Sequence, residues 1–489
     1  MRYHYRYAIV AALAGATLVA ACESATVPDL NAPSTTELAG PLTQASVQRL
    51  VSGLVDNVRR NAGLGYFYFG EAFARDAYRF DPSESRYIYE AYTSAPSRTS
   101  FFGASQYNGF YGTIRAGTTI IKKLKDTPTT TISAPEQAAI RGFVRTFQAL
   151  EYYHVEEYHD TLGTPIQLAD SSKLGPIYCP KSALAAISSL LDSANIDLAA
   201  AVAAGVTTFP FELPSGFVVN GNFTDVTTFR KTFNRGLKGK VEVYRGIGRN
   251  NDGVASSFDV AIAALDTAIG PTPTTMAQLN VGPYFQYSTA PGEFPNPIAD
   301  QNLRINQRVG DSVQAGDLRA SKIVKGDLSS YTARGFKYQT QYYPAVSLTT
   351  RPANFVNPIG ILRVEELVLL RAQAKIGKGD LVGALQDINT VRTISGGLAP
   401  LPPFVATGTL TATQVAIKAL LYEKRYSLLL EGPQRLVDLR AYKMLNAANL
   451  PKEVVPNPIT GAGDRFNSAF FIPQSESDVR GGNVAPVCP

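Results

Sequence analysis

The chain has 489 residues, of which 45% are hydrophobic and 18% charged, and this composition is typical of a globular protein with a large core. Its 46 lysines and arginines against 40 aspartates and glutamates give a net charge of +6, without any run of five or more basic residues. We therefore expect no nucleic-acid partner, because proteins that bind nucleic acids concentrate positive charge on one surface.

The N-terminus has the pattern of a bacterial export signal. Arg2 and Arg6 precede an uncharged run over residues 7–21, which is too short to be a good membrane span. The letters LVAAC (18–22) are similar to a lipobox, in which the thiolate of the cysteine accepts a lipid. We predict a signal peptide with lipobox over residues 1–21, lipidation at Cys22 and a lipid-anchored polar tether over 22–40. A plain secretory signal that ends near a cysteine is the alternative.

Apolar residues at helical spacing predict paired helices through much of the chain. Ser133 with Glu136 is typical of a capping box, Pro180 suits a first helical turn, and Asp380 suits an N-cap. The predicted helical hairpins cover about 43–125, 136–200, 237–269 and 361–394. Hairpins of this size are similar to tetratricopeptide repeats, which bury their apolar faces by stacking. The expected fold class is mainly α, with tetratricopeptide-like hairpins forming a right-handed solenoid scaffold in a single body, 41–489.

The segments between these hairpins are rich in proline, glycine, threonine and asparagine, mainly over 271–360 and 395–410. They are too long to be simple connections, so we predict a loop-rich, irregular lobe beside the helices. Loops held on a rigid scaffold are a usual place for binding sites.

Two cysteines follow Cys22, namely Cys179 and Cys488. In an oxidising compartment they could form a disulfide that ties the C-terminus to an internal loop. The sequence leaves both the bonded and the free state open, because it does not show whether the two backbones come close.

The window 66–111 holds fifteen aromatic residues, while tryptophan is absent from the whole chain. Asp76 and Arg79 are interleaved with these rings, and such a mixture can stack on a ligand and hydrogen-bond it. Residues 84–102 lack helical periodicity, so we expect a loop there. The residues expected to be exposed on it are Tyr87, Tyr89, Tyr92, Phe101 and Phe102. Tyr66 to Phe69, Phe110 and Tyr111 are expected to pack in the core.

Little in the sequence favours catalysis. His154 and His159 are five residues apart, which places them about 140° apart on a helix and predicts no shared metal. No G-x-S-x-G motif occurs, and no cofactor is expected. Neighbouring carboxylates such as Glu156 and Glu157 face different ways on a helix, although a glycosidase with two carboxylates across a cleft stays open.

Five segments, taken in order, resemble the SusD/RagB family of outer-membrane lipoproteins. They are YNGFYGTIRAGTTIIKKL (107–124), RGFVRTFQALEYYHVEEYHDTLGTPIQL (141–168), ILRVEELVLLRAQAKIGKGDLVGALQDINTVR (361–392), EKRYSLLLEGPQRLVDLR (423–440) and FIPQSESDV (471–479). Gly117 stands where the family often has asparagine, and Lys424 precedes Arg425 where the family has glutamate.

This resemblance implies a non-enzymatic, surface-exposed outer-membrane protein that captures oligomers for a SusC-like TonB-dependent transporter. It places ligand contacts in the aromatic window and in the loop 283–308, which also holds Asn302 and Arg304. The predicted ligand-binding residues are Asp76, Tyr78, Arg79, Tyr87, Tyr89, Tyr92, Phe101, Phe102, Tyr284 and Tyr287. The absence of tryptophan departs from starch-binding relatives, so the ligand stays open between other oligosaccharides and peptides.

Charged residues of the family-like segments have a structural interpretation too. Glu431, Arg435, Asp438 and Arg440 are expected to brace the scaffold through ion pairs, and Arg363 with Glu366 to form a pair on one helix face. Two other functions remain as alternatives, namely a helical-repeat scaffold that binds envelope proteins and, with less support, a glycoside hydrolase.

Overall fold

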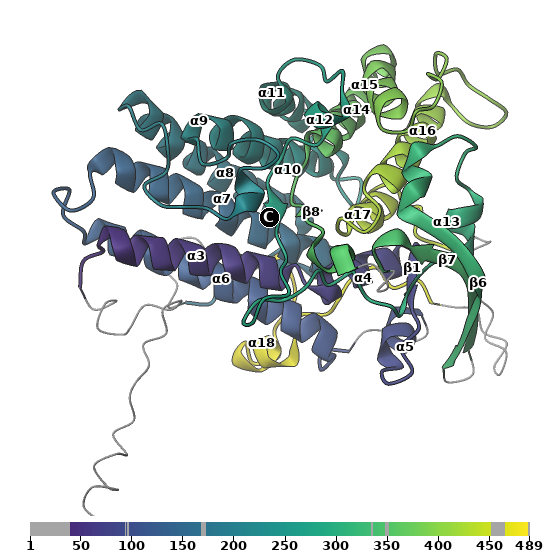
Figure 1. The fold of residues 1–489 in the computed structure, drawn as a ribbon, viewed down its shortest axis with the longest axis horizontal. Coiled ribbons are helices and arrows are strands. Elements are labelled where there is room, and N and C mark those ends of the chain that lie inside the picture. The colour runs from purple at the N-terminus through teal and green to yellow at the C-terminus, as the bar shows by residue number, and fades with distance from the viewer. Residues whose placement is uncertain are drawn as a thin grey trace, which may run out of the picture.

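The computed structural model describes residues 40–92, 94, 97–167, 173–333, 336–347, 352–450 and 465–487 (Figure 1). The predicted signal peptide, the lipobox with Cys22 and the tether up to residue 39 lie outside the described residues, as does Cys488.

The described chain is mainly helical, as predicted. Its longer helices are α3 (Gln44–Asn61), α4 (Leu64–Phe73), α6 (Phe101–Lys125), α7 (Ala134–His159), α8 (Pro180–Ala203), α10 (Arg235–Ile247), α11 (Ser257–Ile269), α14 (Val364–Lys378), α15 (Leu381–Ile394), α16 (Ala412–Ser427) and α17 (Gln434–Ala441). Its shorter helices are α5 (Arg86–Tyr92), α9 (Val226–Thr228), α12 (Met276–Leu279), α13 (Gln307–Asp311) and α18 (Gln474–Val479).

The helices of the predicted hairpins are present and pack in pairs. Helix α7 packs on α8, α10 on α11, α14 on α15, and α6 on both α3 and α7. The local signals behave as expected, because Ser133 and Glu136 form a capping box and the Asp380 side chain accepts a hydrogen bond from the Gly383 amide.

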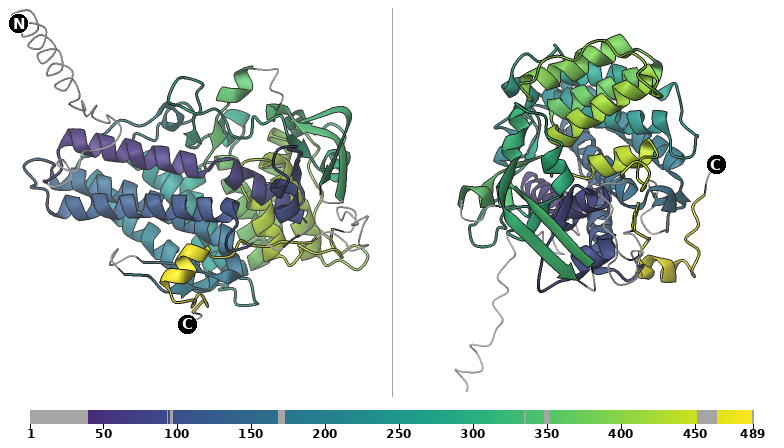
Figure 2. Two further views of the ribbon diagram at one scale, coloured as in Figure 1. Left: turned by 90° about the horizontal axis from the view of Figure 1, so that it is seen from below. Right: turned by 90° about the vertical axis from the view of Figure 1, so that its right-hand side faces the viewer.

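Successive pairs stack through close backbone contacts. Helix α8 contacts α10, and α11 contacts α14, so the pairs form a continuous layered body (Figure 2). Within the pairs, glycines allow the helices to come close, because a Cβ atom on Gly142 of α7 would lie 2.5 Å from Leu198 of α8, and one on Gly239 of α10 would lie 2.4 Å from Leu265 of α11. Helix α8 is long and apolar enough to cross a membrane, but Leu184, Leu191 and Leu198 on it are buried against other helices.

The predicted irregular lobe contains a sheet that was not predicted. The described strands are β1 (Ala77–Arg79), β2 (Thr164–Pro165), β3 (Ile177–Tyr178), β4 (Tyr284–Phe285), β5 (Leu303–Ile305), β6 (Ile323–Ala333), β7 (Phe336–Pro344) and β8 (Ile359–Gly360). Four of them form an antiparallel sheet in the order β1-β5-β7-β6, and the β6–β7 hairpin lies at the right-hand edge of the molecule (Figure 1). The lobe is therefore loop-rich as predicted but more regular than expected, because β5 pairs with β1 across more than 200 residues of sequence and β6 pairs with β7.

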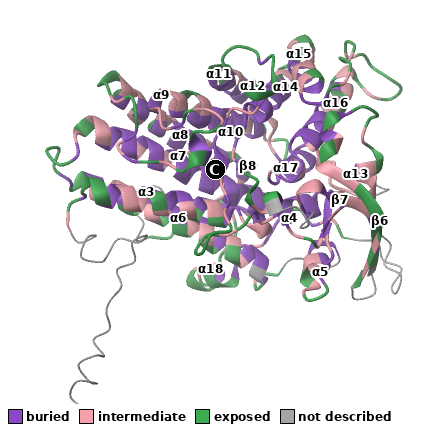
Figure 3. Cartoon of the chain, in the orientation of Figure 1, coloured by how far each residue is buried: buried purple, intermediate pink, exposed green. Residues whose placement is uncertain are grey.

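Helix α7 runs through the core of the molecule (Figure 3). His154 and His159 on it are both buried. Burial lowers the pKa of His159 to about 4 and that of His154 to about 3, so both imidazoles are neutral at physiological pH.

Buried ion pairs brace the C-terminal helices, as predicted. Lys424 lies 2.7 Å from Asp438, and Arg363 lies 2.8 Å from Glu431. The expected pair between Arg363 and Glu366 is not formed. Arg363 is the N-cap residue of α14 and turns to Glu365 and Glu431, while Glu366 faces Lys240 on α10.

Cys179 is disulfide-bonded. The Cys179 amide donates a hydrogen bond to the carbonyl of Val487 at 3.1 Å, and Val487 precedes Cys488 in the chain. Val487 therefore lies beside the start of α8, whereas Cys488, the other cysteine of the possible Cys179–Cys488 disulfide, lies outside the described residues.

Candidate functional site

Most of the aromatic window 66–111 forms core instead of surface. Tyr92 has no exposed surface and Phe102 is 4% exposed, so the prediction that both are exposed was wrong. The reason is that residues 86–92 and 101–125 are helices, which turn these rings inward: the Tyr92 hydroxyl donates to the Ala77 carbonyl, and Phe102 packs 4.6 Å from Phe69. The packing predicted for Phe67, Phe69 and Phe110 is confirmed, whereas the side chain of Phe101 lies outside the described residues.

Several predicted ligand contacts are buried structural residues. Asp76 is 1% exposed and forms an ion pair with Arg425 at 2.5 Å. Tyr78 is 5% exposed, and its hydroxyl accepts a hydrogen bond from Asn306 at 2.8 Å. Tyr287 is buried too. In this structure, the side chains of Asp76, Tyr78, Tyr92, Phe102 and Tyr287 have little surface to offer a ligand.

The two segments that were predicted to form the walls of the site do meet. Strand β1 pairs with β5, which places Tyr78 opposite Arg304. The Arg79 guanidinium donates to the Asp300 carboxylate at 2.6 Å, and its central carbon lies 3.9 Å from the centre of the Tyr87 ring. Tyr87 and Tyr89 are half-buried, so they are less exposed than predicted but keep part of their surface in contact with water.

Strands β6 and β7 extend this surface with two further tyrosines. Tyr331 stacks on Phe80 with ring centres 5.5 Å apart and an interplanar angle of 12°. Arg304 lies between rings, 4.5 Å from the centre of Tyr343 and 5.8 Å from that of Phe80. We call the half-buried group on this surface the tyrosine rim, and it consists of Arg79, Tyr87, Asp300, Arg304, Tyr331 and Tyr343.

Hydrogen bonds and charges hold the polar groups of the rim in place. Burial alone would lower the pKa of Arg79, but the hydrogen bond and charge of Asp300 outweigh it and raise that pKa. Burial would raise the pKa of Asp81, yet hydrogen bonds from Ser83 and the charge of Arg79 keep the pKa of this carboxylate below its usual value. The hydroxyl of Tyr331 donates to the Asp81 carbonyl at 2.6 Å. The rim is therefore a fixed surface of rings and charges, suited to stacking and hydrogen bonding.

Sequence reasoning missed Tyr331 and Tyr343. Both lie in the stretch that was predicted to be irregular, so neither was considered. The signal that could have found them is the density of tyrosine and threonine in the sequence on both sides of Arg334-Gly335, a pattern that is typical of a β-hairpin.

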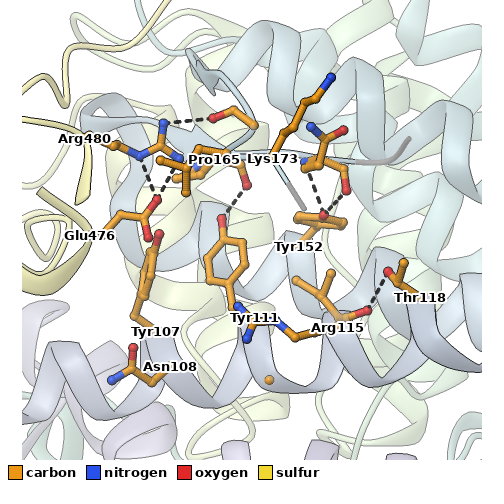
Figure 4. A pocket seen from close by; sticks show the side chains of 15 residues that line it. Tyr107, Asn108, Tyr111, Arg115, Thr118, Tyr152, Pro165, Lys173, Glu476 and Arg480 are labelled. Atoms are coloured by element: carbon orange, nitrogen blue, oxygen red, sulfur yellow. Dashed lines mark hydrogen bonds and ion pairs between the residues drawn. The ribbon is translucent and has the colours of Figure 1, made fainter. Parts of the chain in front are cut away.

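A second candidate is a cavity of about 530 Å³ between α6, α7, α18 and residues 173–175 (Figure 4). We call it the Tyr107 pocket. Its lining includes Tyr107, Tyr111, Arg115, Tyr152, Lys173, Glu476 and Arg480. Tyr111 was predicted to be a packing residue, and it is partly buried yet also contributes to this pocket.

Tyr284 lines two further cavities. It lines a cavity of about 910 Å³ near Arg363 and also one of about 490 Å³ beside α3. Tyr284 is 9% exposed and its hydroxyl donates to the Asn280 carbonyl at 2.8 Å, so its side chain is held in place where it contributes to both cavities.

The described residues contain no group of three or more histidine, cysteine, aspartate or glutamate side chains that could hold a metal ion. Glu157 and Glu366 converge on Lys240, at 3.7 and 3.0 Å. Both carboxylates are buried, and they form part of the core.

Solved structures show what this fold is similar to. A SusD superfamily protein from Bacteroides fragilis aligns with a TM-score of 0.63 and 15% identity, over 90% of this chain and 98% of that chain. A SusD-like carbohydrate binding protein from Bacteroides vulgatus aligns with a TM-score of 0.53 and 13% identity, over 82% and 83% of the two chains. A crystal structure with xylogluco-oligosaccharide aligns with a TM-score of 0.54 and 14% identity, over 82% and 84%. No protein-family model matches the chain, and neither does any curated protein. The protein therefore has the SusD fold, as the sequence resemblance predicted.

Proposed function

We propose that this chain is a non-catalytic, lipid-anchored outer-membrane protein that binds oligosaccharides at the tyrosine rim and passes them to a SusC-like TonB-dependent transporter. The observation that carries the proposal is the pairing of β1 with β5, which joins the two predicted walls into one surface of half-exposed rings and charges. Among the similar structures, one is named a carbohydrate binding protein and another contains xylogluco-oligosaccharide, which favours a glycan over a peptide as ligand.

The rim suits a sugar polymer for physical reasons. The apolar face of a pyranose ring can rest on the rings of Tyr331 and Tyr343, while Arg79, Arg304 and Asp300 offer hydrogen-bonding groups to hydroxyls. These side chains are already held by one another, so little conformational entropy is lost when a ligand binds. Affinity would come from stacking and hydrogen bonds, without any bond made or broken.

The anchor and the partner follow from the N-terminal pattern and the family resemblance. A lipid on Cys22, with a tether up to residue 40, would keep the folded body at the membrane without spanning it. A transporter that accepts the captured oligomer is the partner that the resemblance implies.

The test uses the full chain purified in detergent and an array of oligosaccharides and peptides, followed by calorimetry with the best ligand. We expect an oligosaccharide to bind, and Tyr343→Ala to weaken it about fivefold, which corresponds to about 1 kcal/mol of stacking. The double variant Tyr331→Ala/Tyr343→Ala should weaken it about 25-fold if the two rings act independently.

Tyr342→Ala is the matched control. Tyr342 neighbours Tyr343 on β7, but its hydroxyl bonds Asp311 on α13 instead of facing Arg304. Its removal should leave binding within about twofold. Equal binding by the wild type and the double variant would overturn the rim as the site, and a peptide as sole ligand would overturn the proposed ligand class. Turnover of a bound glycan would overturn the non-catalytic role.

A further inference from the structure

The largest of the three cavities described above has a volume of about 910 Å³ and is lined mainly by side chains that do not stack. Asparagines from four separate segments contribute to it, and we call it the asparagine cavity. They are Asn220, Asn280, Asn296, Asn354 and Asn357. Tyr284 is the one aromatic residue of the lining, and it is only 9% exposed. Recognition of a ligand here would therefore rest on hydrogen bonds instead of ring stacking.

Two of these asparagines keep hydrogen-bonding groups that the fold does not use. Asn220 is half-buried, and its side-chain amide makes no hydrogen bond within the described residues. Asn280 is half-buried as well, and its Oδ1 accepts a hydrogen bond from Arg363 at 3.1 Å, while its side-chain NH2 group donates to no described residue. Asn296 differs, because it is buried and donates to the Asn357 carbonyl at 2.7 Å. A side-chain amide offers both donors and an acceptor, so Asn220 and Asn280 can bind a ligand that carries both.

The charged side chains of the lining neutralise one another. Its three cations each have a carboxylate partner, in the pairs Arg319 with Asp317 at 2.8 Å, Lys322 with Glu431 at 3.1 Å and Arg363 with Glu365 at 2.6 Å. The five N–H donors of Arg363 all have acceptors within the protein. A charged ligand would lose its hydration in this cavity without gaining an unpaired charge of opposite sign. The lining therefore favours a neutral ligand.

Apolar side chains lie beside the amides and keep part of their surface in contact with water. Met276 is 40% and Leu318 is 64% exposed, while Val346 and Ile394 are half-buried. An acetamido group combines the features that match this lining, because it carries an N–H donor, a carbonyl acceptor and a methyl group, and it has no charge. An asparagine side chain can exchange two hydrogen bonds with such a group, and the methyl group gains free energy when it leaves water for an apolar contact.

We propose that the asparagine cavity binds the acetamido group of a neutral N-acetylated sugar unit, and that it is a second saccharide site beside the tyrosine rim. This inference rests on the proposed function in so far as the chain binds saccharides at all. The two sites share no residue, and they use different forces: the rim offers partly exposed rings, whereas the cavity offers amides. The cavity would thereby select oligosaccharides by the substituent of one sugar unit, while the rim holds the ring faces of others.

Two substitutions remove the amides without removing a bond that the fold needs. Asn220→Ala deletes the side-chain amide, whereas the backbone carbonyl of Asn220 still accepts from the Gly282 amide at 2.9 Å. Asn280→Asp keeps an oxygen atom that accepts from Arg363 but deletes the NH2 donors. Asn250→Ala is the matched control, because Asn250 is exposed, its side chain makes no hydrogen bond within the described residues, and it lies outside the cavity.

The experiment measures by calorimetry how the full chain in detergent binds three hexasaccharides that differ only in the substituent at carbon 2 of each unit. Chitohexaose carries acetamido groups, cellohexaose hydroxyls and the glucosamine hexamer amines. We expect chitohexaose to bind about tenfold more tightly than the other two, with an affinity that does not change with salt. Its binding should weaken about fivefold in Asn220→Ala and in Asn280→Asp, and should be unchanged in Asn250→Ala. Melting temperatures should show that every variant is folded.

The outcomes separate this inference from the proposed function. Equal affinity for chitohexaose and cellohexaose would overturn the acetamido site while the rim stands, and so would chitohexaose binding that is unchanged in both asparagine variants. Hexaglycine carries amides without a sugar ring, so its binding, with a loss in Asn220→Ala, would overturn the sugar as ligand. If chitohexaose did not bind but another oligosaccharide of the array did, only the inference would fall. If no saccharide bound at all, both would fall.

Discussion

The same residue types serve opposite purposes in two neighbouring regions of this molecule. In the aromatic core, Phe69 contacts Phe102 and Phe470 at 4.6 and 5.2 Å, and all three rings are buried. On the tyrosine rim, Tyr331 and Tyr343 are stacked on one side by Phe80 and Arg304 and remain half-buried. The comparison teaches that the density of aromatic residues in a window does not mark a binding surface. What marks it is a ring that is fixed by its neighbours while part of it stays in contact with water.

The largest expected effect tests the core side of this comparison. Tyr92→Ala and Phe102→Ala should each lower the free energy of unfolding by about 3–5 kcal/mol, because each removes a fully packed ring. Tyr343→Ala, a rim variant, should cost less than about 1 kcal/mol. Urea unfolding followed by circular dichroism measures the three values. Near-equal losses of unfolding free energy for Phe102→Ala and Tyr343→Ala would contradict the distinction between core and rim.

Substitutions of charged residues should show the same difference in stability loss between core and rim. Lys424→Met leaves Asp438 without its ion-pair partner in the core, and we expect a loss of about 3 kcal/mol of stability. Arg304 on the rim is in contact with water, so Arg304→Gln should cost about 1 kcal/mol or less. The measurement is again denaturant unfolding, with unchanged slopes as the control for two-state behaviour. A stable Lys424→Met variant would show that the buried pair does not brace the helices.

Lowering the pH should reduce the stability of the protein through its buried histidines. The pKa of His159 in the folded protein is lowered to about 4. As the pH falls below about 6.5, His159 therefore takes up a proton in the unfolded chain but stays neutral in the folded protein. The contribution of His159 to stability is therefore present above pH 6.5 and is lost as the pH falls towards 4. His159→Gln removes this dependence, so the stability difference between wild type and variant should narrow by about 1.4 kcal/mol per pH unit between pH 6.5 and 4.5.

The quantity to measure is the difference in unfolding free energy between the wild type and His159→Gln. The stability of either protein alone also depends on buried carboxylates, whose pH dependence has the opposite sign. Burial raises the pKa of Glu156 to about 7, so its contribution is lost as the pH rises through that value. Both proteins share this term, and it cancels. A difference that stays constant with pH would show that His159 is not held neutral.

The smallest expected effect separates the ring of Tyr331 from its hydroxyl. Tyr331→Phe removes the hydrogen bond to the Asp81 carbonyl and should lower stability by about 1 kcal/mol or less. The stacked ring remains, so glycan binding should stay within about twofold of the wild type. A large loss of binding would mean that the hydroxyl, and not the ring face, contacts the ligand.

The sequence by itself determined the helical frame. The capping box of Ser133 and Glu136, the N-cap Asp380 and the first-turn Pro180 each act within a few residues, so a linear pattern is sufficient to locate α7, α8 and α15. The five family-like segments predicted the SusD fold for the same reason, since each is a contiguous stretch of helix or turn. The predictions of these three helices, which rested on local signals, were confirmed.

Only the tertiary structure decided which side chains face water. Whether Tyr92 is core or surface depends on its contact with Ala77 and Tyr338, and whether Arg304 joins the rim depends on β1 pairing with β5. These contacts join residues up to about 250 positions apart, and no local spacing encodes them. Arg363 shows the same limit of local spacing. It forms an ion pair with Glu431 on another segment and not with Glu366, which lies three residues away. Local physics fixes helices, but the burial of a side chain is a property of the partner that covers it.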